Sequence, residues 1–454
     1  MTSQGRDLAV LALSDRMGYV SASLDRLIGR GRISDADRSL AYELALGAHR
    51  RRGTLDAVLR AFLARPGKRL PITLNSILHV ALYQLLFLTR VPDFAAVDEA
   101  VDQAKRLHHN RQKDLVNAVL RTVIRNVSDR SAGRLSVSCQ VLPTWPGEYR
   151  TFTRAVLADP QAQPAEYLAD AYSLPLSLTR RWLGRYGFEL ACRLGMHSCC
   201  RPAIVLRVNK LKASLEGAMA ELAADEVGAQ LHANGQSIVI AQGGGVRNLR
   251  AVREGLVQPQ DPTATAVVLA AGPAGGQRVL DFCAAPGTKT THLAELMSNR
   301  GEIIAVDVSA EKIDRISARC AEMGVSIVRT LEAGKLGSLE LAGFDLVLVD
   351  APCSNTGVLA RRVEARWRFA EDALGRLAGD QKRLAVAAAE YVRPGGRLVY
   401  STCSIEPEEC SEVSRWLVKR KLNLQLIDEQ LTLPSGADEP RQWCDGGYYA
   451  VFRA

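Results

Sequence analysis

The hydrophobic positions change their spacing about halfway along the chain. Before residue 126, apolar residues recur three and four positions apart, as in Ile77, Val80 and Ala81. This spacing is the period of a helix with one buried face. No run of alternating apolar and polar residues competes with it, so the first part of the chain is predicted to be all-helical.

After about residue 230 the pattern is different. Short runs rich in β-branched and aromatic residues alternate with helical stretches, which is typical of a mostly parallel, doubly wound sheet. The predicted strands are Ser237–Ala241, Arg278–Phe282, Glu302–Asp307, Phe344–Asp350, Gly396–Tyr400 and Tyr448–Phe452. Because ligands of such sheets bind at the carboxyl ends of the strands, the residues that follow each strand are the first candidates for a site.

Two segments lie between these parts. Ser, Gly and Pro are frequent over residues 126–165, which indicates a connector with room for short helices of its own. Beyond it, a helical pattern interrupted by an extended piece at Ile204–Val208 predicts a small α+β subdomain. The predicted domains are a helical domain over 1–128, a connector over 129–165, the α+β subdomain over 166–230 and an α/β domain over 231–454.

Composition and charge narrow the class of protein. Of the 454 residues, 47% are hydrophobic and 24% are charged, which is typical of folded domains and excludes a disordered or fibrous chain. The net charge is +9, and residues 1–130 hold 21 Lys and Arg against 13 Asp and Glu. Because the surplus is concentrated in the first third, a polyanion is the expected partner there.

The cysteines and the termini indicate the compartment. Ten cysteines are too sparse for a disulfide framework, and neither they nor the histidines show the spacing of a metal site. The first ten residues lack the apolar core of a signal peptide, and the longest apolar stretch is too short to span a bilayer. A cytoplasmic protein without metal or membrane partner is therefore expected.

A loop of small residues, Cys283–Lys289, joins a predicted strand to a helix. Small residues let a ligand approach the backbone closely. Asp307 ends the next strand, where a carboxylate can accept hydrogen bonds from ribose hydroxyls. The loop lacks the pattern of a phosphate-binding loop and has one glycine where a dinucleotide fingerprint has three. A nucleoside with a non-phosphate tail, such as S-adenosylmethionine, fits better; the alternative is a plain turn with a solvent-facing Asp307.

Two other strands each lead into a loop that carries a cysteine. Cys353 follows Asp350 by three residues, and Cys403 follows Tyr400 by three. Both loops leave the sheet at the same edge, so the two thiols can converge. A single cysteine at a strand end is usually a small apolar residue of the core. The residues by themselves leave both interpretations open, reactive thiols or core packing.

The three loop motifs together resemble a known enzyme family. Ala-Ala-Pro-Gly-x-Lys-Thr at 284–290, Asp-Ala-Pro-Cys-Ser at 350–354 and Thr-Cys-Ser at 402–404 are similar to the NOL1/NOP2/Sun family of RNA cytosine-C5 methyltransferases. The segments 91–101 and 117–121 resemble a NusB-type RNA-binding domain, and 207–209 also matches. The resemblance implies an all-α NusB-like domain, a small α+β linker subdomain and an α/β Rossmann-like class I methyltransferase domain, as in bacterial members that act on 16S ribosomal RNA.

The resemblance also implies covalent catalysis. Cytosine C5 is a poor nucleophile until a thiolate adds at C6 and forms an enamine. The family assigns this attack to the Thr-Cys-Ser cysteine, here Cys403, and a part in product release to the Pro-Cys cysteine, here Cys353. Asp350 is expected to hydrogen-bond the cytosine edge. The target base must be unpaired or flipped out of its helix.

S-adenosylmethionine is the cofactor that the resemblance implies. The expected binding residues are Cys283, Ala284, Ala285, Pro286, Gly287, Thr288, Lys289, Asp307, Glu332 and Asp350. Three positions depart from the family pattern: Glu332 replaces the usual aspartate, and Thr288 and Asn355 each replace a glycine. Because asparagine tolerates left-handed backbone, the turn at Asn355 is expected to survive.

Basic clusters and family matches predict the RNA contacts. The expected residues are Arg50, Arg51, Arg52, Lys105, Arg106, Arg111, Lys113, Arg207, Asn209 and Arg366. Contacts of this kind position RNA through its phosphates. The expected protein is a monomer that methylates a cytosine of 16S ribosomal RNA. Two alternatives stay open: a transfer RNA cytosine-C5 methyltransferase, and a catalytically degenerate RNA-binding factor for ribosome assembly.

Overall fold

The computed structural model describes residues 4–15, 19–29, 31, 33–65, 69–107, 109–132, 137–240, 245–420 and 423–454. It divides the chain into two compact units, each described here by itself. Unit 1 comprises Met1–Arg201 and Leu359–Phe369, and unit 2 comprises Pro202–Val358 and Ala370–Ala454. This partition differs from the predicted domains at two places. Residues 166–201 belong to unit 1, and so does a short segment that the sequence placed within the α/β domain.

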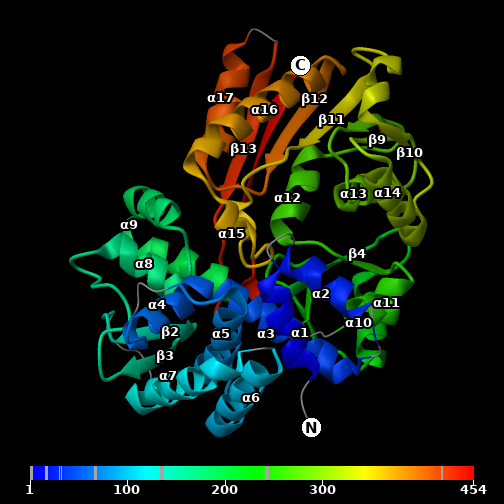
Figure 1. Cartoon of the computed structure of the whole chain (residues 1–454). Coiled ribbons are helices and arrows are strands. Elements are labelled where there is room, and N and C mark those ends of the chain that lie inside the picture. The colour runs from blue at the N-terminus through cyan, green and yellow to red at the C-terminus, as the bar shows by residue number, and fades with distance from the viewer. Residues whose placement is uncertain are drawn as a thin grey trace. The chain divides into compact units, whose positions relative to one another are not determined.

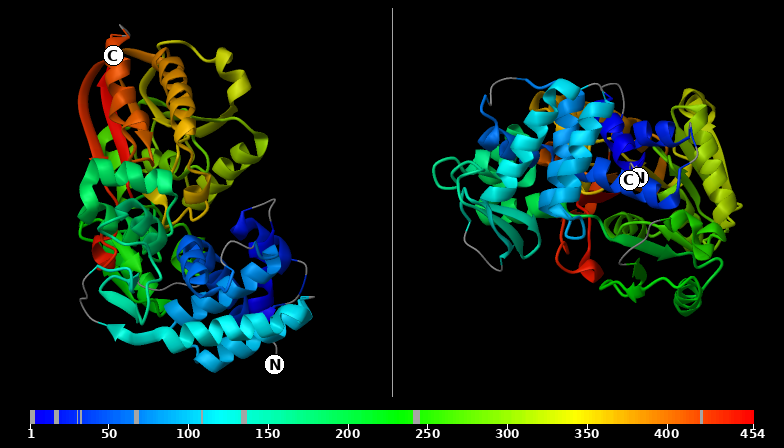
Figure 2. Two further views of the ribbon diagram at one scale, coloured as in Figure 1. Left: turned by 60° about the vertical axis from the view of Figure 1, so that its left-hand side comes forward. Right: turned by 60° about the horizontal axis from the view of Figure 1, so that its bottom comes forward.

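Unit 1 is a helical bundle built around one apolar helix. Its helices are α1 (Gln4–Ser14), α2 (Val20–Ile28), α3 (Asp35–Arg50), α4 (Arg52–Phe62), α5 (Ile72–Phe87), α6 (Asp93–Arg106), α7 (Lys113–Asn126), α8 (Pro164–Tyr172), α9 (Leu176–Cys199) and the short α15 (Ala365–Arg368). Thirteen of the 16 residues of α5 are buried, because α1, α3, α4, α6 and α7 all pack on it. Figure 2 shows these helices, blue to cyan, from two sides. The all-helical prediction for the first part of the chain is confirmed.

The predicted connector is a small antiparallel sheet. Strands β1 (Val127–Ala132), β3 (Glu148–Phe152) and β2 (Val141–Trp145) lie side by side in that order. The expectation of short helices here was wrong. Four consecutive residues at the start of β2 are buried, so this strand lacks the alternation that would have marked it in the sequence.

Unit 2 begins with a small α+β subdomain whose sheet reaches residue 259, beyond the predicted bounds of 166–230. Its sheet runs in the order β5 (Ala229–Leu231), β6 (Ser237–Ile240), β4 (Ile204–Val208) and β7 (Val257–Pro259), all antiparallel. The strand predicted at 237–241 as part of the mostly parallel sheet pairs here instead, antiparallel, as Ser237–Ile240. Helices α10 (Leu215–Ala224) and α11 (Arg250–Arg253) accompany it. Leu206, Leu222 and Ile238 are fully buried in the core between these elements. The extended piece predicted at 204–208 is confirmed as β4.

The remainder of unit 2 is a seven-stranded sheet. Its strand order is β10 (Val328–Glu332), β9 (Glu302–Asp307), β8 (Arg278–Asp281), β11 (Phe344–Asp350), β12 (Val392–Thr402), β14 (Gly447–Arg453) and β13 (Gln425–Thr432). The first five are parallel, and β14 and β13 run antiparallel to their neighbours. This confirms the predicted mostly parallel sheet, although the sequence did not reveal β10 and β13.

Helices cover both faces of this sheet (Figure 1). One apolar core lies between the strands and α12 (Pro262–Ala271) and α13 (Thr288–Leu296), and α14 (Ala310–Met323) extends this layer. The other lies between the strands and α16 (Glu371–Ala389) and α17 (Ser411–Lys419). Because both faces are buried, the strands are nearly continuous apolar runs, and polar residues gather only at their ends. Among the described residues, no helix is both long and apolar enough to cross a bilayer.

Candidate active site

Neighbouring parallel strands bring the predicted catalytic and cofactor residues to one edge of the sheet. Asp281, Asp307 and Asp350 are the last residues of β8, β9 and β11, which are adjacent. Asp350 pairs with Ser401 of β12, and Cys403 follows two residues later. The loops after these strands therefore emerge side by side, at the edge where doubly wound sheets bind ligands.

The two predicted catalytic thiols meet at this edge. Cys353 Sγ lies 3.1 Å from Cys403 Sγ, within hydrogen-bond distance. The Cys403 thiol also lies 3.2 Å from Asn355 Oδ1, and the Asn355 amide donates to the Cys353 carbonyl oxygen at 2.7 Å. Asn355 has a left-handed φ of 63°, which confirms that asparagine can serve where the family pattern has glycine. Both thiols are only partly buried, unlike core cysteines.

The thiol of Cys353 has a raised pKa. The hydrogen bond with Cys403 raises the pKa of Cys353 well above that of a free thiol, and burial and the nearby charges of Cys403 and Glu409 add to the effect. Cys353 is therefore a neutral thiol in contact with the Cys403 sulfur. This arrangement suits Cys403 as the nucleophile, because the thiolate is the reactive form of cysteine.

Asp350 lies beside the thiols in an ion pair. Lys289 Nζ lies 2.6 Å from Asp350 Oδ2, and the Ser401 hydroxyl donates to Asp350 Oδ1 at 2.9 Å. Burial acts to lower the pKa of Lys289, but the Asp350 carboxylate outweighs it and raises that pKa, so the ammonium remains charged. About a third of the Asp350 side chain is exposed, which leaves its oxygens accessible to a base in the site.

The loop after β8 is shaped by the absence of a side chain at Gly287. Gly287 has a φ of 91° and immediately precedes α13, and a Cβ there would lie 3.3 Å from Ile316 Cα. The bare backbone of the loop therefore packs directly against α14. In the same loop, burial, helped by the charges of Asp350 and Asp281, raises the pKa of Cys283 to about 12, so this thiol stays neutral.

Asp307 is held as a carboxylate at the end of β9. Its oxygens accept hydrogen bonds from the backbone N–H groups of Ala285 at 3.0 Å and Val308 at 2.7 Å, and from Lys312 Nζ at 2.8 Å. Burial raises the pKa of Asp307, but these bonds outweigh it and lower that pKa. Glu332 stands opposite Asp307 in the parallel register and is exposed. A strand-end carboxylate beside a loop of small residues fits the nucleoside part of S-adenosylmethionine.

Asp281 is buried between these groups. Its carboxyl accepts a hydrogen bond from the Thr290 hydroxyl at 2.6 Å, and its second oxygen has no partner among the described residues. Burial raises the pKa of Asp281 to about 7; the Thr290 bond opposes this shift, and the negative charge of Asp350 adds to it. At neutral pH this residue therefore titrates inside the folded protein.

Replacing Asp281 with asparagine should remove a pH-dependent loss of stability. A carboxyl whose folded pKa of about 7 exceeds its unfolded value of 3.8 contributes stability that is fully present below pH 3.8 and is lost as the pH rises through 7. In thermal unfolding, Asp281→Asn should therefore gain in Tm relative to wild type between about pH 5 and pH 8. An equal Tm difference at both pH values would contradict this origin.

The residues that join the two thiol loops were not predictable from their own sequence. Ser354 and Ser404, each following one of the cysteines, both donate a hydroxyl hydrogen to the carboxylate of Glu409. Gln381 of α16 donates to the same carboxylate at 3.1 Å. The only signal in the sequence was an acidic pair, Glu408 and Glu409, shortly after the Cys403 loop, and a pair of this kind is more often exposed.

Five of the ten predicted RNA contacts are interior residues, and for these the prediction was wrong. Arg51 and Arg366 are fully buried, and Arg50, Arg207 and Asn209 are at most 7% exposed. Each is bonded within its own unit, so its side chain is not available to a phosphate. Arg366 shows the reason: its guanidinium donates to carbonyl oxygens of residues 50, 173, 198 and 359 and fixes the chain that surrounds it.

The other buried residues have similar structural contacts. Arg51 donates to the carbonyl oxygens of Pro143 and Thr144 and lies 4.6 Å from the ring of Phe87. In unit 2, the guanidinium of Arg207 is ion-paired with buried Glu295. The amide of Asn209 donates to the carbonyl oxygens of residues 255 and 323 at 2.8 and 2.9 Å. The side chains of Arg51, Arg207 and Asn209 therefore connect separate segments within their own units.

The remaining predicted RNA contacts lie at or near the surface of unit 1. They are Arg52, Lys105, Arg106, Arg111 and Lys113. Arg106 forms ion pairs with Asp7 and Glu99, and Lys105 forms one with Asp102. The other three form no ion pair within the part of the chain that the structure describes. The guanidinium of Arg52 lies 4.5 Å from the centre of the Trp367 ring.

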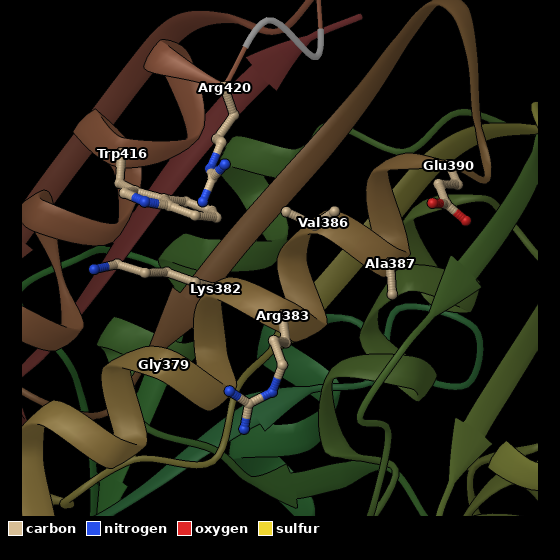
Figure 3. Close-up of a pocket in the computed structure, with 8 residues that line it drawn as sticks. All are labelled: Gly379, Lys382, Arg383, Val386, Ala387, Glu390, Trp416 and Arg420. Atoms are coloured by element: carbon tan, nitrogen blue, oxygen red, sulfur yellow. The ribbon is translucent and has the colours of Figure 1, made fainter.

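A groove lies between α16 and α17 (Figure 3). Its volume is about 640 Å³, and it is lined by Gly379, Lys382, Arg383, Val386, Ala387, Glu390, Trp416 and Arg420. The charged ends of Arg420 and Lys382 lie 4.4 and 5.6 Å from the ring of Trp416. None of the predicted catalytic or cofactor residues lines this groove, so it is not part of the candidate active site. Elsewhere in the described ranges, no cluster of three His, Cys, Asp or Glu side chains is arranged to bind a metal.

Comparison with known families agrees with this geometry. Residues 267–445 match the profile described as 16S rRNA methyltransferase RsmB/F, and residues 4–125 match that of the NusB family. The helical unit and the sheet edge with its nucleoside and thiol loops thus define a methyltransferase that carries a NusB domain. The crystal structure of PH0851 has the same fold over 100% of this chain and 99% of its own, with a TM-score of 0.76 and 23% identity.

Two relatives extend the comparison over most of the chain. The probable ribosomal RNA small subunit methyltransferase B of Bacillus subtilis (strain 168) is 31% identical over 408 residues, covering 89% of this chain and 85% of its own. The ribosomal RNA small subunit methyltransferase B of Escherichia coli O7:K1 is 30% identical over 432 residues, covering 92% and 91%. The chain therefore belongs to the RsmB/F family of 16S rRNA methyltransferases, and its methyl donor is S-adenosylmethionine.

Proposed function

We propose that this protein methylates C5 of a cytosine in 16S ribosomal RNA through a transient bond between Cys403 and C6. The observation that carries the proposal is the 3.1 Å contact between the sulfurs of Cys403 and Cys353, at the edge of the sheet that also holds the nucleoside loop. A single thiol suffices for packing, whereas two thiols from separate strands in contact are suited to paired roles in covalent catalysis.

Attack and charge stabilisation are assigned to Cys403 and Asp350. The Cys403 thiolate adds to C6, and the electron pair of the C5–C6 double bond makes C5 nucleophilic. Asp350, held by Lys289 and Ser401, hydrogen-bonds the cytosine edge while this charge develops. When bound, S-adenosylmethionine supplies the electrophilic methyl group that C5 takes up. An unpaired or flipped cytosine is needed, because C6 is inaccessible inside a stacked helix.

Release of the product is assigned to the thiol pair. The C5 proton passes to solvent, its electron pair restores the C5–C6 double bond, and the bond between C6 and sulfur breaks with its electron pair returning to Cys403 as a thiolate. The Cys353 thiol touches that sulfur, so it is the side chain placed to take part in this step. Its raised pKa means that it is protonated while Cys403 attacks, and it therefore does not compete as a nucleophile.

The cofactor is assigned to the carboxyl ends of β8, β9, β10 and β11 and to the loop after β8. The residues that would hold it are Cys283, Ala284, Ala285, Pro286, Gly287, Thr288, Lys289, Asp307, Glu332 and Asp350. Asp307 would accept hydrogen bonds from the ribose hydroxyls, and Glu332, next to it in register, would face the adenine side. The backbone at Gly287 lets the loop lie close to the ligand.

The surface cations of unit 1 are assigned to RNA phosphates. Arg52, Arg111 and Lys113 are the strongest candidates, with Lys105 and Arg106 beside acidic partners. Such contacts position RNA and weaken with salt. We further propose that the protein acts as a monomer in the cytoplasm, where ribosomal RNA is its substrate.

The function is tested by methyl transfer from labelled S-adenosylmethionine. The purified protein should label 16S ribosomal RNA but not transfer RNA, and bisulfite mapping should place the label on C5 of one cytosine. Labelling of transfer RNA would favour that alternative substrate. Cofactor binding without methyl transfer to either RNA would favour a catalytically degenerate assembly factor and would contradict the proposed methylation of cytosine C5.

A further inference from the structure

Glu409 is a buried carboxylate without a cationic partner. It lies in the short turn between the Cys403 loop and α17, and none of its surface is exposed. No lysine or arginine of the described residues forms an ion pair with it. A buried carboxylate is costly unless hydrogen-bond donors surround its oxygens. The hydrogen-bond donors around Glu409 therefore identify the segments of the chain that this carboxylate joins.

Those donors come from both thiol loops. Ser354, next to Cys353, gives its backbone N–H to Glu409 Oε1 at 2.8 Å and its hydroxyl to Oε2. Ser404, next to Cys403, gives its hydroxyl to Oε2 at 2.6 Å. A third element, α16, contributes a donor at 3.1 Å to Oε1. One carboxylate is thus bonded to the residue that immediately follows each cysteine.

We propose that Glu409 is a positioning residue that locks the Cys353 loop against the Cys403 loop, so that the two sulfurs stay in contact. The cysteines are 50 residues apart and follow different strands, β11 and β12. Strand pairing ends at Asp350 and Ser401, and beyond that point the Gly357 N–H still donates to the Cys403 carbonyl oxygen at 3.0 Å. The residues next to the two cysteines, Ser354 and Ser404, are held together by side-chain bonds, of which those to Glu409 reach both loops. The mechanistic meaning of this role rests on the proposed function, because that function assigns both thiols to one reaction.

The charge of Glu409 has a second effect on the pair. The hydrogen bond with Cys403 and burial are the main causes that raise the pKa of Cys353, and the negative charge of Glu409 raises it further. Glu409 therefore both fixes the loops and favours the protonated form of Cys353. An amide at this position would keep most of the hydrogen bonds and lose the charge, whereas alanine would lose both. The two substitutions separate geometry from charge.

The first test compares turnover in three variants. Glu409→Ala should lower kcat for methyl transfer about 100-fold, because misplaced reacting groups cost about that much, while the Kd for S-adenosylmethionine stays within about threefold. Glu409→Gln, which keeps the bonds to both loops, should recover kcat to within about tenfold of wild type. The matched control is Glu412→Ala. Glu412 is the same residue type, lies three positions further along the chain and is exposed on α17, so its substitution should leave kcat unchanged.

The second test does not require methylation. Diamide takes two electrons and two protons from a pair of thiols and leaves a disulfide, at a rate that depends on how closely the thiols are held. Peptide mass spectrometry should show the Cys353–Cys403 disulfide forming about tenfold more slowly in Glu409→Ala than in wild type or Glu409→Gln. This measurement distinguishes the two proposals. If wild type fails to methylate RNA but the disulfide rates follow this order, the proposed function is wrong and the positioning role of Glu409 is still supported.

Equal disulfide rates and equal kcat in Glu409→Ala and wild type would overturn the positioning role. Loss of cofactor affinity equal to the loss of kcat would also overturn it, because that result indicates general disruption of the site. Should Glu409→Ala fail to fold, Ser404→Ala removes the bond between Glu409 and the Cys403 loop, together with the Ser404 hydroxyl contacts to Ser354 and Thr356, and should slow disulfide formation in the same direction. An unchanged rate in that folded variant would overturn the role as well.

Discussion

Replacing Cys403 with alanine is expected to abolish methyl transfer while cofactor binding survives. If Cys403 forms the bond to C6, its loss removes the only route that makes C5 nucleophilic, and kcat should fall by about 10⁴-fold or more. The residues proposed to hold the cofactor lie at the ends of β8, β9, β10 and β11 and do not include Cys403, so the Kd for S-adenosylmethionine should change by less than about twofold. Filter binding of RNA that carries labelled methyl groups measures kcat, and calorimetric titration with the cofactor measures the Kd for S-adenosylmethionine.

Cys320→Ala is the control for this experiment. Cys320 lies in the core between α14 and the sheet, away from the thiol pair, so its substitution should leave turnover nearly unchanged. Turnover by Cys403→Ala within tenfold of wild type would show that another group performs the attack. Loss of cofactor affinity in the same variant would show that the substitution disturbs the sheet edge as a whole.

Replacing Cys353 with alanine is expected to trap the enzyme on its RNA. The Cys353 thiol contacts the Cys403 sulfur, and without it the bond between Cys403 and C6 forms but breaks slowly. A denaturing gel should then show a slow-migrating species that contains both protein and RNA, at close to one RNA per chain. Multiple turnover should fall by about 100-fold or more, while a single methyl group is still transferred.

The double variant Cys353→Ala, Cys403→Ala identifies the bond. It should give no slow-migrating species, because the sulfur that attacks is absent. A gel without any adduct for Cys353→Ala, using RNA that wild type methylates, would exclude the release role of Cys353. An adduct that persists in the double variant would place the covalent bond on another residue.

The site loops were predictable because their chemistry is local. The strands β8, β9 and β11 each end in an aspartate that follows a short apolar run, and the apolar run 398–400 within β12 leads into the Thr-Cys-Ser loop. These boundaries are visible in the sequence. Parallel strands place their carboxyl ends at one edge, so Cys353 and Cys403 were expected to converge. The 3.1 Å distance between their sulfurs agrees with that expectation.

The elements that were missed have weak local signals. β13 lies at the edge of the sheet and is mostly exposed, so it lacks the apolar run of a central strand. β10 is also an edge strand, and none of its residues is fully buried. Edge strands are stabilised by backbone pairing with a neighbour, and the identity of that neighbour is not encoded in the strand's own residues.

By itself the sequence determined the helical first part, the parallel sheet and the chemical groups that follow each strand, since these depend on periodicity and on neighbouring residues. Only the tertiary structure decided that Arg51, Arg207 and Arg366 are interior supports and that Glu409 joins the two thiol loops. An arginine or glutamate has the same formal charge in either environment. Its role depends on whether distant parts of the chain close over it and supply hydrogen-bond partners, and Arg366 and its acceptor at Arg50 are 316 residues apart.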